Sequence, residues 1–336
     1  MQSSYGVLHL ENKSLDSEHV FALDVLEGLS AHPKTIPSKH LYDEHGSRLF
    51  HKITELDDYY QFRCELEVLE QFKHQILQMI GKAPFRLIEL GVGDGRKTRM
   101  LLRHFLDQGV EIEYFPIDYC SAIVSTVVES LKQEFSGRPL KVVGMEADYF
   151  SSFSWLEKKS ARRNVVLFLG SSIGNLDRHE TEHLLHHMWN SLNQGDLVLI
   201  GFDLKKDISV LERAYNDSAG ITRAFNINLL NRMNRELNAH FNPAQFKHYS
   251  FYNPGKARME SWIISKISQT IEIEKLQKEF SFEAWEGVHV ENSYKYDFKN
   301  IADLALCTDF LVKREMVDAK GYFTAAILEV HKDKIG

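Results

Sequence analysis

The sequence predicts an α/β protein with a doubly wound parallel sheet as its core and a second, smaller lobe formed by the rest of the chain. Three observations carry this prediction. Between residues 85 and 203, apolar runs typical of buried strands alternate with segments of helical spacing. A glycine turn, Gly91–Gly95, joins the first strand to the next helix. The alternation stops after Asp203 and resumes only near the C-terminus. Such alternation is typical of a parallel sheet with helices on both faces.

The N-terminal third prepares the first strand. Residues 1–36 are polar with short apolar patches, and they include an expected helix at Glu18–Leu29. Residues 37–60 combine aromatic residues with turn formers and are too irregular for one helix. From Cys64 to Ile80 apolar residues recur at helical spacing, which predicts an amphipathic helix.

The remaining elements follow in order. Buried strands are expected at 87–90, 112–117, 140–144, 165–169 and 197–202, with a helix near 179–192. A mostly helical stretch at 210–237 and strand-like runs at 259–267 and 270–273 read as an insertion, before a helix near 298–304 and two strands ending at 330. We therefore expect the core at 62–203 and 286–336, and the substrate-binding lobe at 1–61 and 204–285.

Composition limits the class of protein. The 336 residues are 43% hydrophobic and 26% charged, with a net charge of -7, so nothing draws the molecule as a whole to nucleic acid. The three cysteines are scattered, which favours a reducing compartment. The N-terminus has no signal-peptide pattern, and no apolar run approaches the length of a membrane span. We expect a cytoplasmic protein; its oligomeric state stays open, with a monomer favoured.

The glycine turn indicates a nucleotide-type ligand. Gly91, Gly93 and Gly95 follow Glu89 with Gly-x-Gly-x-Gly spacing, not the Gly-x-Gly-x-x-Gly of dinucleotide binders. Glycine lets the chain turn sharply and lets a ligand lie against bare backbone. This version suits S-adenosylmethionine, which has a ribose and an adenine but no pyrophosphate. A tight turn without a ligand is the alternative. We assign Glu89, Gly91 and Gly93 to the cofactor site.

Polar residues at other strand ends converge on the same edge of the sheet. Asp118 would accept hydrogen bonds from ribose hydroxyls, or alternatively cap the next helix. Asp148 would accept the adenine amine and Tyr149 would cover the ring, unless the two form a plain turn. Lys97, in the first turn of a helix, could reach the methionyl carboxylate.

A helical histidine pair allows a second interpretation. His183 and His187 stand at i, i+4, which is a possible metal pair, but the polar face of a surface helix is the favoured interpretation. No third ligand is evident, and methyl transfer needs none, so we expect no metal.

Four stretches together resemble the histidine-specific, S-adenosylmethionine-dependent N-methyltransferases of ergothioneine biosynthesis, which have a Rossmann-like class I methyltransferase core. The similarity covers about residues 35–330. The stretches are Leu41-Tyr-Asp-Glu-His-Gly-Ser-Arg-Leu-Phe50 with Tyr59-Tyr60, Glu89–Thr98, Leu169-Gly-Ser-Ser-Ile-Gly-Asn175, and Ala214-Tyr215 through Gly220–Asn226 to Leu237.

The resemblance implies roles at the amino-acid end of the acceptor. Asn175 and Tyr215 would hold the α-amino and carboxylate groups, with Tyr42 nearby and Gly170 shaping the floor of the pocket. We assign Asn175 and Tyr42 as the catalytic pair, with Tyr42 or water as the proton relay. Ser171-Ser172 departs from the Gly-Thr that the family often has.

The resemblance also implies how the imidazole ring is read. Tyr59 would contact the ring, Glu291 and Ser293 would hydrogen-bond it, and Met259 and Phe50 would line the pocket. Trimethylation of the α-amine of histidine is the expected reaction. The same fold also serves enzymes that methylate a prenylated tryptophan. A nicotinamide-dependent oxidoreductase and a non-catalytic binding module are the alternatives from other classes.

Overall fold

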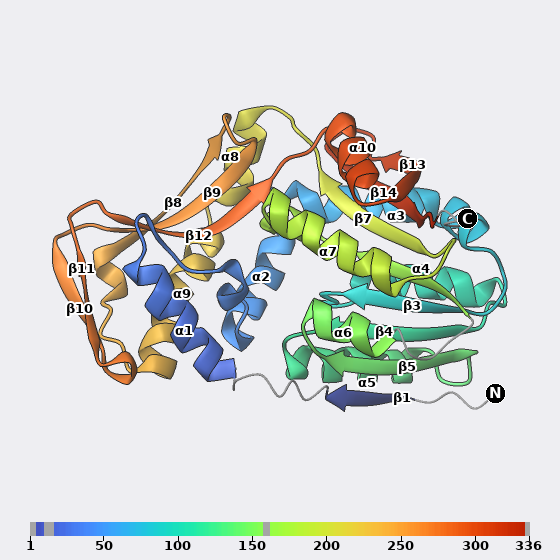
Figure 1. Ribbon diagram of the computed structural model, residues 1–336, viewed down its shortest axis with the longest axis horizontal. Coiled ribbons are helices and arrows are strands. Elements are labelled where there is room, and N and C mark those ends of the chain that lie inside the picture. Colours follow the sequence, from blue (N-terminus) through green and yellow to red (C-terminus); the bar gives the residue numbers. More distant parts are fainter. Residues whose placement is uncertain (1–4, 10–16, 157–161, 333–336) are drawn as a thin grey trace. The chain divides into compact units, whose positions relative to one another are not determined.

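The computed structural model describes residues 5–9, 17–156 and 162–332. The chain divides into two compact units (Figure 1), each built from separate stretches of sequence. Unit 1 consists of residues 1–12, 61–205 and 295–336, and unit 2 of residues 13–60 and 206–294.

Unit 1 contains an eight-stranded sheet in the order β1-β5-β4-β3-β6-β7-β14-β13. Its strands are β1 (Tyr5–His9), β3 (Phe85–Leu90), β4 (Ile112–Asp118), β5 (Leu140–Glu146), β6 (Arg163–Phe168), β7 (Leu197–Asp203), β13 (Phe310–Val317) and β14 (Phe323–Val330). The strands from β1 to β7 pair in parallel, whereas β14 and β13 are antiparallel. The sheet order reverses beside β3, as expected for a doubly wound core.

Both faces of this sheet are covered by helices, because alternate strand residues point to opposite sides. On one face Leu87 packs in a core with α3 (Tyr60–Ile80), α4 (Arg96–Asp107) and α5 (Ser121–Glu134). On the other, Ile88 packs in a core with α6 (Tyr149–Leu156), α7 (Arg178–Ser191) and α10 (Phe298–Cys307). The near-continuous apolar strands are explained by this double coverage. The predicted α/β core is confirmed.

Unit 2 is built on a smaller sheet in the order β2-β12-β9-β8. Its strands are β2 (Lys34–Thr35), β8 (Phe246–Asn253), β9 (Arg258–Ser265) and β12 (Gly287–Tyr294), with a separate hairpin of β10 (Gln269–Ile273) and β11 (Lys278–Phe282). Its helices are α1 (Ser17–Ser30), α2 (Glu44–Thr54), α8 (Ile208–Tyr215) and α9 (Ile221–Leu237). Helix α9 packs against both α2 and the sheet.

Two of the expected boundaries need correction. Residues 1–61 were all assigned to the smaller lobe, yet Tyr5–His9 forms β1 and pairs with β5 in the sheet of unit 1. Residues 286–294 were assigned to the core, but β12 pairs with β9 in unit 2. Both errors concern strands whose partners lie far away in sequence, and local patterns carry no signal for such pairing.

The N-terminus of α7 is stabilised by its own side chains. Helix α7 begins with a capping box, in which the Asp177 side chain accepts from Glu180 N and the Glu180 side chain accepts from Asp177 N.

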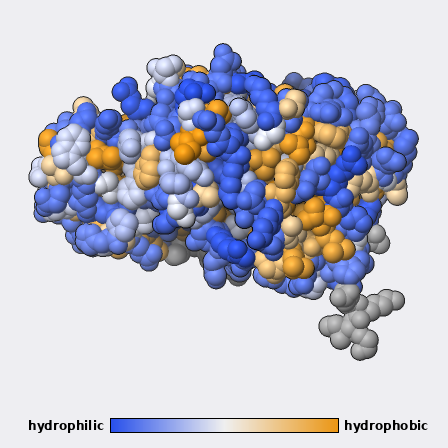
Figure 2. Space-filling view, turned by 90° about the horizontal axis from the view of Figure 1, so that it is seen from above, coloured by the Kyte–Doolittle hydropathy of each residue, from blue (hydrophilic) through white to orange (hydrophobic). Residues whose placement is uncertain are grey.

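In the part of the chain that the structure describes, no helix has the length and apolar character to cross a membrane. Figure 2 shows a mainly hydrophilic face with hydrophobic groups gathered in places.

Candidate active site

The glycine turn after β3 presents bare backbone. Gly91, Gly93 and Gly95 all have positive φ (69°, 53° and 68°), a region that side chains disfavour. The N–H groups of Gly91 and Val92 donate to Ile117 O at 2.9 and 3.0 Å, which ties the turn to β4. A Cβ on Gly93 would meet nothing within 4 Å. The turn is therefore fixed by β4 and open at Gly93.

Asp118 lies beside this turn, as predicted. It ends β4, and its two carboxylate oxygens accept from Gly93 N at 3.3 Å and from Cys120 N at 3.1 Å. Burial raises the pKa of Asp118, and these backbone N–H groups oppose the rise. The N-cap of α5 is Cys120, so Asp118 is not the cap. Each oxygen keeps a further lone pair for a ligand hydroxyl.

Asp148 and Tyr149 follow β5. Asp148 accepts hydrogen bonds from Ser151 N at 2.8 Å and from the Ser151 hydroxyl, so it also stabilises the start of α6. A Cβ on Gly91 would lie 3.2 Å from the Tyr149 hydroxyl, which places this tyrosine against the glycine turn. Burial raises the pKa of Tyr149 above its usual range. Contact with adenine stays a prediction for both residues.

Glu89 lies beneath the turn rather than on it. It is 2% exposed and accepts from Thr98 Oγ1 at 2.6 Å and from the Tyr114 hydroxyl. Burial raises its pKa to about 7, although both hydrogen bonds act in the other direction. Glu89 thus joins β3, β4 and the first turn of α4, and a direct contact with the cofactor stays a prediction.

Lys97 and Gly170 share a partner that the sequence analysis missed. Lys97 Nζ lies 2.5 Å from Glu65 Oε2, and Gly170 N donates to both Glu65 oxygens at 2.9 Å. Glu65 stands on the buried stripe of α3 with Val68 and Leu69. An acidic residue on an apolar helix stripe was the available signal.

The turn after β6 carries Asn175. Gly170 and Ser171 have positive φ (78° and 57°), and a 3₁₀ turn, η2 (Ser172–Asn175), follows. Ser171 Oγ accepts from Asp203 N at 3.2 Å, which fixes the turn to β7. Asn175 is half-buried at the end of η2. Its amide offers a donor and an acceptor.

In unit 2, three predicted residues form one aromatic cluster. The ring centroid of Phe50 lies 5.4 Å from that of Tyr42 and 6.1 Å from that of Tyr59. Phe225, which was not assigned, completes the cluster at 5.3 Å from Tyr42 and 5.8 Å from Phe50. Most of these contacts are edge-to-face, a favourable aromatic geometry.

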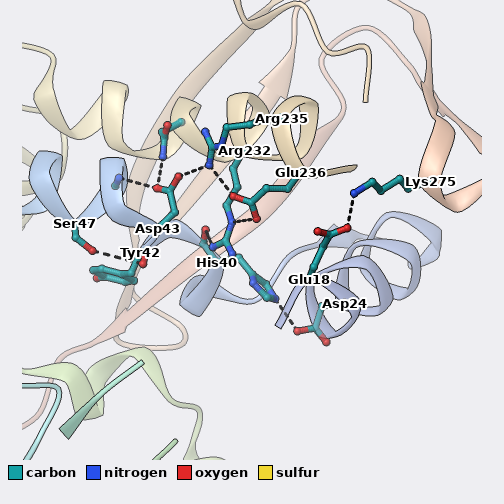
Figure 3. Close-up of polar contacts among 12 residues, drawn as sticks. Glu18, Asp24, His40, Tyr42, Asp43, Ser47, Arg232, Arg235, Glu236 and Lys275 are labelled. Carbon is teal, nitrogen blue, oxygen red and sulfur yellow. Dashed lines mark hydrogen bonds and ion pairs between the residues drawn. The ribbon is translucent and has the colours of Figure 1, made fainter. Parts of the chain in front are cut away.

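The segment that carries Tyr42 is clamped to α9 (Figure 3). Asp43 accepts from Gly46 N at 2.7 Å, as the N-cap of α2, from Asn228 Nδ2 at 2.7 Å, and from Arg235 at 2.6 Å. Arg232 donates to His40 O at 2.9 Å. The backbone on both sides of Tyr42 is therefore fixed to one helix.

The sheet of unit 2 brings the other predicted residues together. Ser293 of β12 pairs with Met259 of β9, and the Tyr215 hydroxyl donates to Ser293 Oγ at 2.6 Å. The register of β12 shifts between His289 and Glu291, after which Glu291 and Ser293 share one face. Glu291 is half-buried, whereas Tyr215 and Ser293 are buried.

One of these contacts joins residues predicted at different ends of the acceptor. Tyr215 is expected at the amino-acid end and Ser293 at the ring end, and their hydroxyls are hydrogen-bonded. Which end of the acceptor each of them contacts stays a prediction.

The histidine pair of α7 packs against an aromatic ring. The centroids of His183 and His187 lie 5.0 and 5.2 Å from that of Phe150, and the His187 ring hydrogen-bonds Phe150 O at 3.2 Å. Within residues 5–9, 17–156 and 162–332, no group of three or more His, Cys, Asp or Glu side chains could hold a metal ion.

The residues of unit 1 fit an adenosine-type ligand. Gly93 opens onto space that a side chain would fill, and the Asp118 carboxylate adjoins it, so backbone and an acceptor for hydroxyls occur together. The hydroxyl of Tyr149 lies against the same turn.

Known proteins resemble the chain over most of its length. A family model described as histidine-specific, S-adenosylmethionine-dependent methyltransferase matches residues 21–330. A histidine N-alpha-methyltransferase of Mycolicibacterium smegmatis is 35% identical, over 84% of this chain and 86% of that protein. Ergothioneine biosynthesis protein 1 of Schizosaccharomyces pombe is 30% identical, over 83% of this chain and 37% of that protein.

A more distant relative has a different acceptor in its name. It is the 4-dimethylallyltryptophan N-methyltransferase of Claviceps purpurea, 23% identical over 84% of this chain and 87% of that protein. The glycine turn with Asp118 at its side, the family match over 21–330 and the mycobacterial relative all agree. The chain therefore belongs to the histidine-specific, S-adenosylmethionine-dependent methyltransferases.

Proposed function

We propose that this enzyme methylates the α-amino group of L-histidine, in successive transfers that end at the trimethylated product. The observation that carries the proposal is the polar face of the sheet in unit 2. There Glu291 and Ser293 share one side of β12, with Met259 opposite Ser293. A carboxylate and a hydroxyl two residues apart supply the partners that an imidazole needs on its two nitrogens.

The hydrogen bond from Tyr215 supports this reading of the ring. The Tyr215 hydroxyl donates to Ser293 Oγ at 2.6 Å, which helps to position the Ser293 side chain on the face of β12 that Glu291 shares. In the proposed complex, Ser293 donates to the unprotonated nitrogen of a neutral imidazole, while Glu291 accepts from the protonated one. Such a pair selects a neutral ring in one tautomer.

The aromatic cluster supports the multiple transfers. Each transfer after the first acts on a more substituted amine, and the final product is a quaternary ammonium that cannot form N–H hydrogen bonds. Aromatic faces attract such cations. Tyr42, Phe50, Tyr59 and Phe225 supply four rings for this purpose.

The chain's residues contribute mainly geometry to the reaction. Bound S-adenosylmethionine supplies an electrophilic methyl group: the amine lone pair forms the N–C bond as the C–S bond breaks, and the sulfide leaves with that electron pair. Asn175 orients the amine through its amide, and proximity of this kind accounts for much of the acceleration in such reactions. The amine proton leaves to water or through the Tyr42 hydroxyl.

Product masses test the proposal directly. The enzyme is incubated with S-adenosylmethionine and each amino acid in turn, and mass spectrometry follows additions of one, two and three methyl groups. Histidine is expected to gain three, with the intermediates appearing first. Methylation of another amino acid in preference to histidine would refute the assignment of the acceptor, and accumulation at one methyl group would refute the successive transfers.

A tryptophan derivative is the second candidate acceptor, because one relative carries that substrate in its name. Against it, an indole has a single N–H and no ring acceptor, so it could not accept a hydrogen bond from Ser293. Dimethylallyltryptophan therefore belongs among the substrates of the same assay.

A further inference from the structure

Glu65 is a buried carboxylate that neither the sequence motifs nor the proposed function uses. It lies on α3, is 0% exposed, and stands on the stripe that buries Val68 and Leu69. Burying an ionised carboxylate is unfavourable unless the charge is paired and the oxygen lone pairs are hydrogen-bonded. Its partners therefore indicate why an acid occupies this position.

Those partners come from a segment of the predicted donor site and a segment of the predicted acceptor site. Lys97 Nζ from the first turn of α4 lies 2.5 Å from Glu65 Oε2. Gly170 N, at the end of β6, donates to both oxygens at 2.9 Å. A Cβ on Gly201 would lie 2.4 Å from Glu65 Oε1, so β7 leaves room for the carboxylate only because it has glycine there. Four elements meet at this group.

The two side chains of the ion pair differ in their exposure to solvent. The side chain of Lys97 is 16% exposed, whereas that of Glu65 is 1% exposed. A ligand carboxylate can thus reach the ammonium but not the acid behind it. The first turn of α4 also favours anions, because its backbone N–H groups point toward them.

A lysine by itself is a poorly fixed anchor. Its four-carbon side chain loses much rotamer freedom when a ligand holds it, which weakens binding. An ion pair already made with Glu65 removes that loss before the ligand arrives. Phe62 adds a further contact, since Lys97 Nζ lies 5.6 Å from the centroid of its ring.

We propose that Glu65 is a positioning residue of the methyl-donor site. It holds the Lys97 ammonium where the carboxylate of the donor's methionyl group binds, and through Gly170 it fixes the start of the 170–175 turn to the same point. Glu65 touches no ligand itself. The inference rests on the predicted role of Lys97 in the proposed function, and it does not depend on which amine is methylated.

Two nucleosides separate this role from a purely structural one. S-adenosylhomocysteine carries the amino-acid carboxylate, and 5′-methylthioadenosine has the same thioether and adenosine without it. Glu65→Gln keeps the length of the side chain and an oxygen for Gly170 N–H but removes the charge. By titration calorimetry we expect S-adenosylhomocysteine to bind about tenfold more weakly, a change of ~1.4 kcal/mol. The affinity for 5′-methylthioadenosine is expected to stay within about twofold.

Three further variants complete the test. Lys97→Met is expected to lower the affinity for S-adenosylhomocysteine but not the affinity for 5′-methylthioadenosine. In the Lys97→Met background, Glu65→Gln is expected to have no further effect on either affinity, because the two residues act through one ammonium. Glu70→Gln makes the same chemical change on the exposed side of α3 and is expected to bind both nucleosides normally.

Several outcomes would overturn the proposal. Equal loss of both nucleosides in folded Glu65→Gln would make Glu65 a structural residue only. An undiminished affinity for S-adenosylhomocysteine in that variant, or in Lys97→Met, would remove the pair from the site. Should Glu65→Gln fail to fold, the Lys97→Met arm decides alone. The titrations contain no acceptor, so a wrong assignment of histidine leaves their result unchanged.

Discussion

Glu291 is the residue on which the choice of acceptor depends. The register shift before it places its half-buried carboxylate on the same face as Ser293. A hydrogen bond to a charged group contributes about 1.5–3 kcal/mol, which is about ten- to 150-fold in affinity. Only an amino acid with a ring N–H in the right place benefits from it.

Glu291→Ala is therefore expected to lower the affinity for histidine by that factor and to change the affinity for apolar amino acids little. Calorimetry with each amino acid, in the presence of S-adenosylhomocysteine, measures the change. The same truncation at the exposed Glu279 of β11 serves as the control. An equal loss for all amino acids would show that Glu291 holds the fold of the pocket instead of reading the ring.

Glu89 gives unit 1 an unusual pH dependence. Its native pKa of about 7 lies above the usual 4.5, mainly because the carboxyl is buried. Between these values the native state binds more protons than the unfolded state, so the free energy of unfolding falls as pH rises from about 4.5 to about 7.

Glu89→Gln, which cannot ionise, is expected to remove about 1–3 kcal/mol of that fall, an order-of-magnitude figure. Urea unfolding at about pH 5 and about pH 8 measures it, with Glu129→Gln on the exposed side of α5 as the control. If wild type and Glu89→Gln lose the same stability between the two pH values, Glu89 is already ionised in the native protein at acid pH.

At the scale of elements, the turn between β6 and α7 combines backbone strain with a side-chain anchor. Ser171 has a φ of 57°, where a glycine would be less strained, but its Oγ accepts from the buried Asp203 N. The backbone conformation costs a serine about 1–2 kcal/mol. An unpaired buried N–H costs about 1–3 kcal/mol, which is similar to the strain or larger, so the anchor offsets most or all of it.

Ser171→Gly is accordingly expected to be neutral or destabilising, by up to about 2 kcal/mol, although it relieves a left-handed residue. Gln277→Gly is the matched comparison, because Gln277 also has a positive φ (50°) but is exposed at the end of a 3₁₀ turn. There we expect a gain of up to about 1 kcal/mol. Chemical unfolding of both variants checks the contrast, and a clear gain for Ser171→Gly would mean that its hydroxyl is not an anchor.

Helix α9 shows how far a local pattern can be read. Its helical periodicity was recognisable, and the chain is helical from Ile221 to Leu237. Its role as the clamp of residues 40–46 was not, since Arg232 and Arg235 look like ordinary surface charges in the sequence. Phe225 was not predicted as a member of the aromatic cluster, because its partner Tyr42 lies far away in the sequence.

At the scale of the whole molecule, the buried groups with large pKa shifts in the two units act on stability with opposite signs. In unit 2, burial lowers the pKa of His40 and of His248 to about 4. Their unfolded forms take up protons near the usual 6.5, so this part of the stability is lost as pH falls from about 6.5 to about 4. In unit 1, Glu89 acts with the other sign.

Hydrogen exchange followed by mass spectrometry can resolve the two units. After correction for intrinsic exchange rates, amides of unit 2 are expected to lose protection before those of unit 1 as pH falls from about 6.5 to about 4. Parallel loss in both units, or earlier loss in unit 1, would contradict this order. His248→Asn, which cannot take up the proton, is expected to delay the loss in unit 2.

The sequence predicted most of the core of unit 1, because its strands from β3 to β7 are recognisable from their own apolar residues. Buried apolar runs such as 197–202 and the glycine turn need no distant partner to be recognised. Three features depend on contacts between residues that are distant in sequence. They are the pairing of β1 with β5, the place of β12 in the sheet of unit 2, and the ion pair of Lys97 with Glu65. No local pattern encodes such contacts, so they could not be predicted.

The order of the strands also bears on how the protein is made by the ribosome. Strand β7 is buried throughout and pairs on one side with β6, but its other neighbour, β14, follows only after residues 204–322 have been synthesised. Residues 206–294, the larger of the two stretches of unit 2, emerge in between. At about 5–20 residues per second, the apolar edge of β7 stays without its neighbour for on the order of ten seconds. During that interval the nascent chain exposes an unpaired, aggregation-prone edge strand, and a chaperone that covers it would raise the yield of folded enzyme.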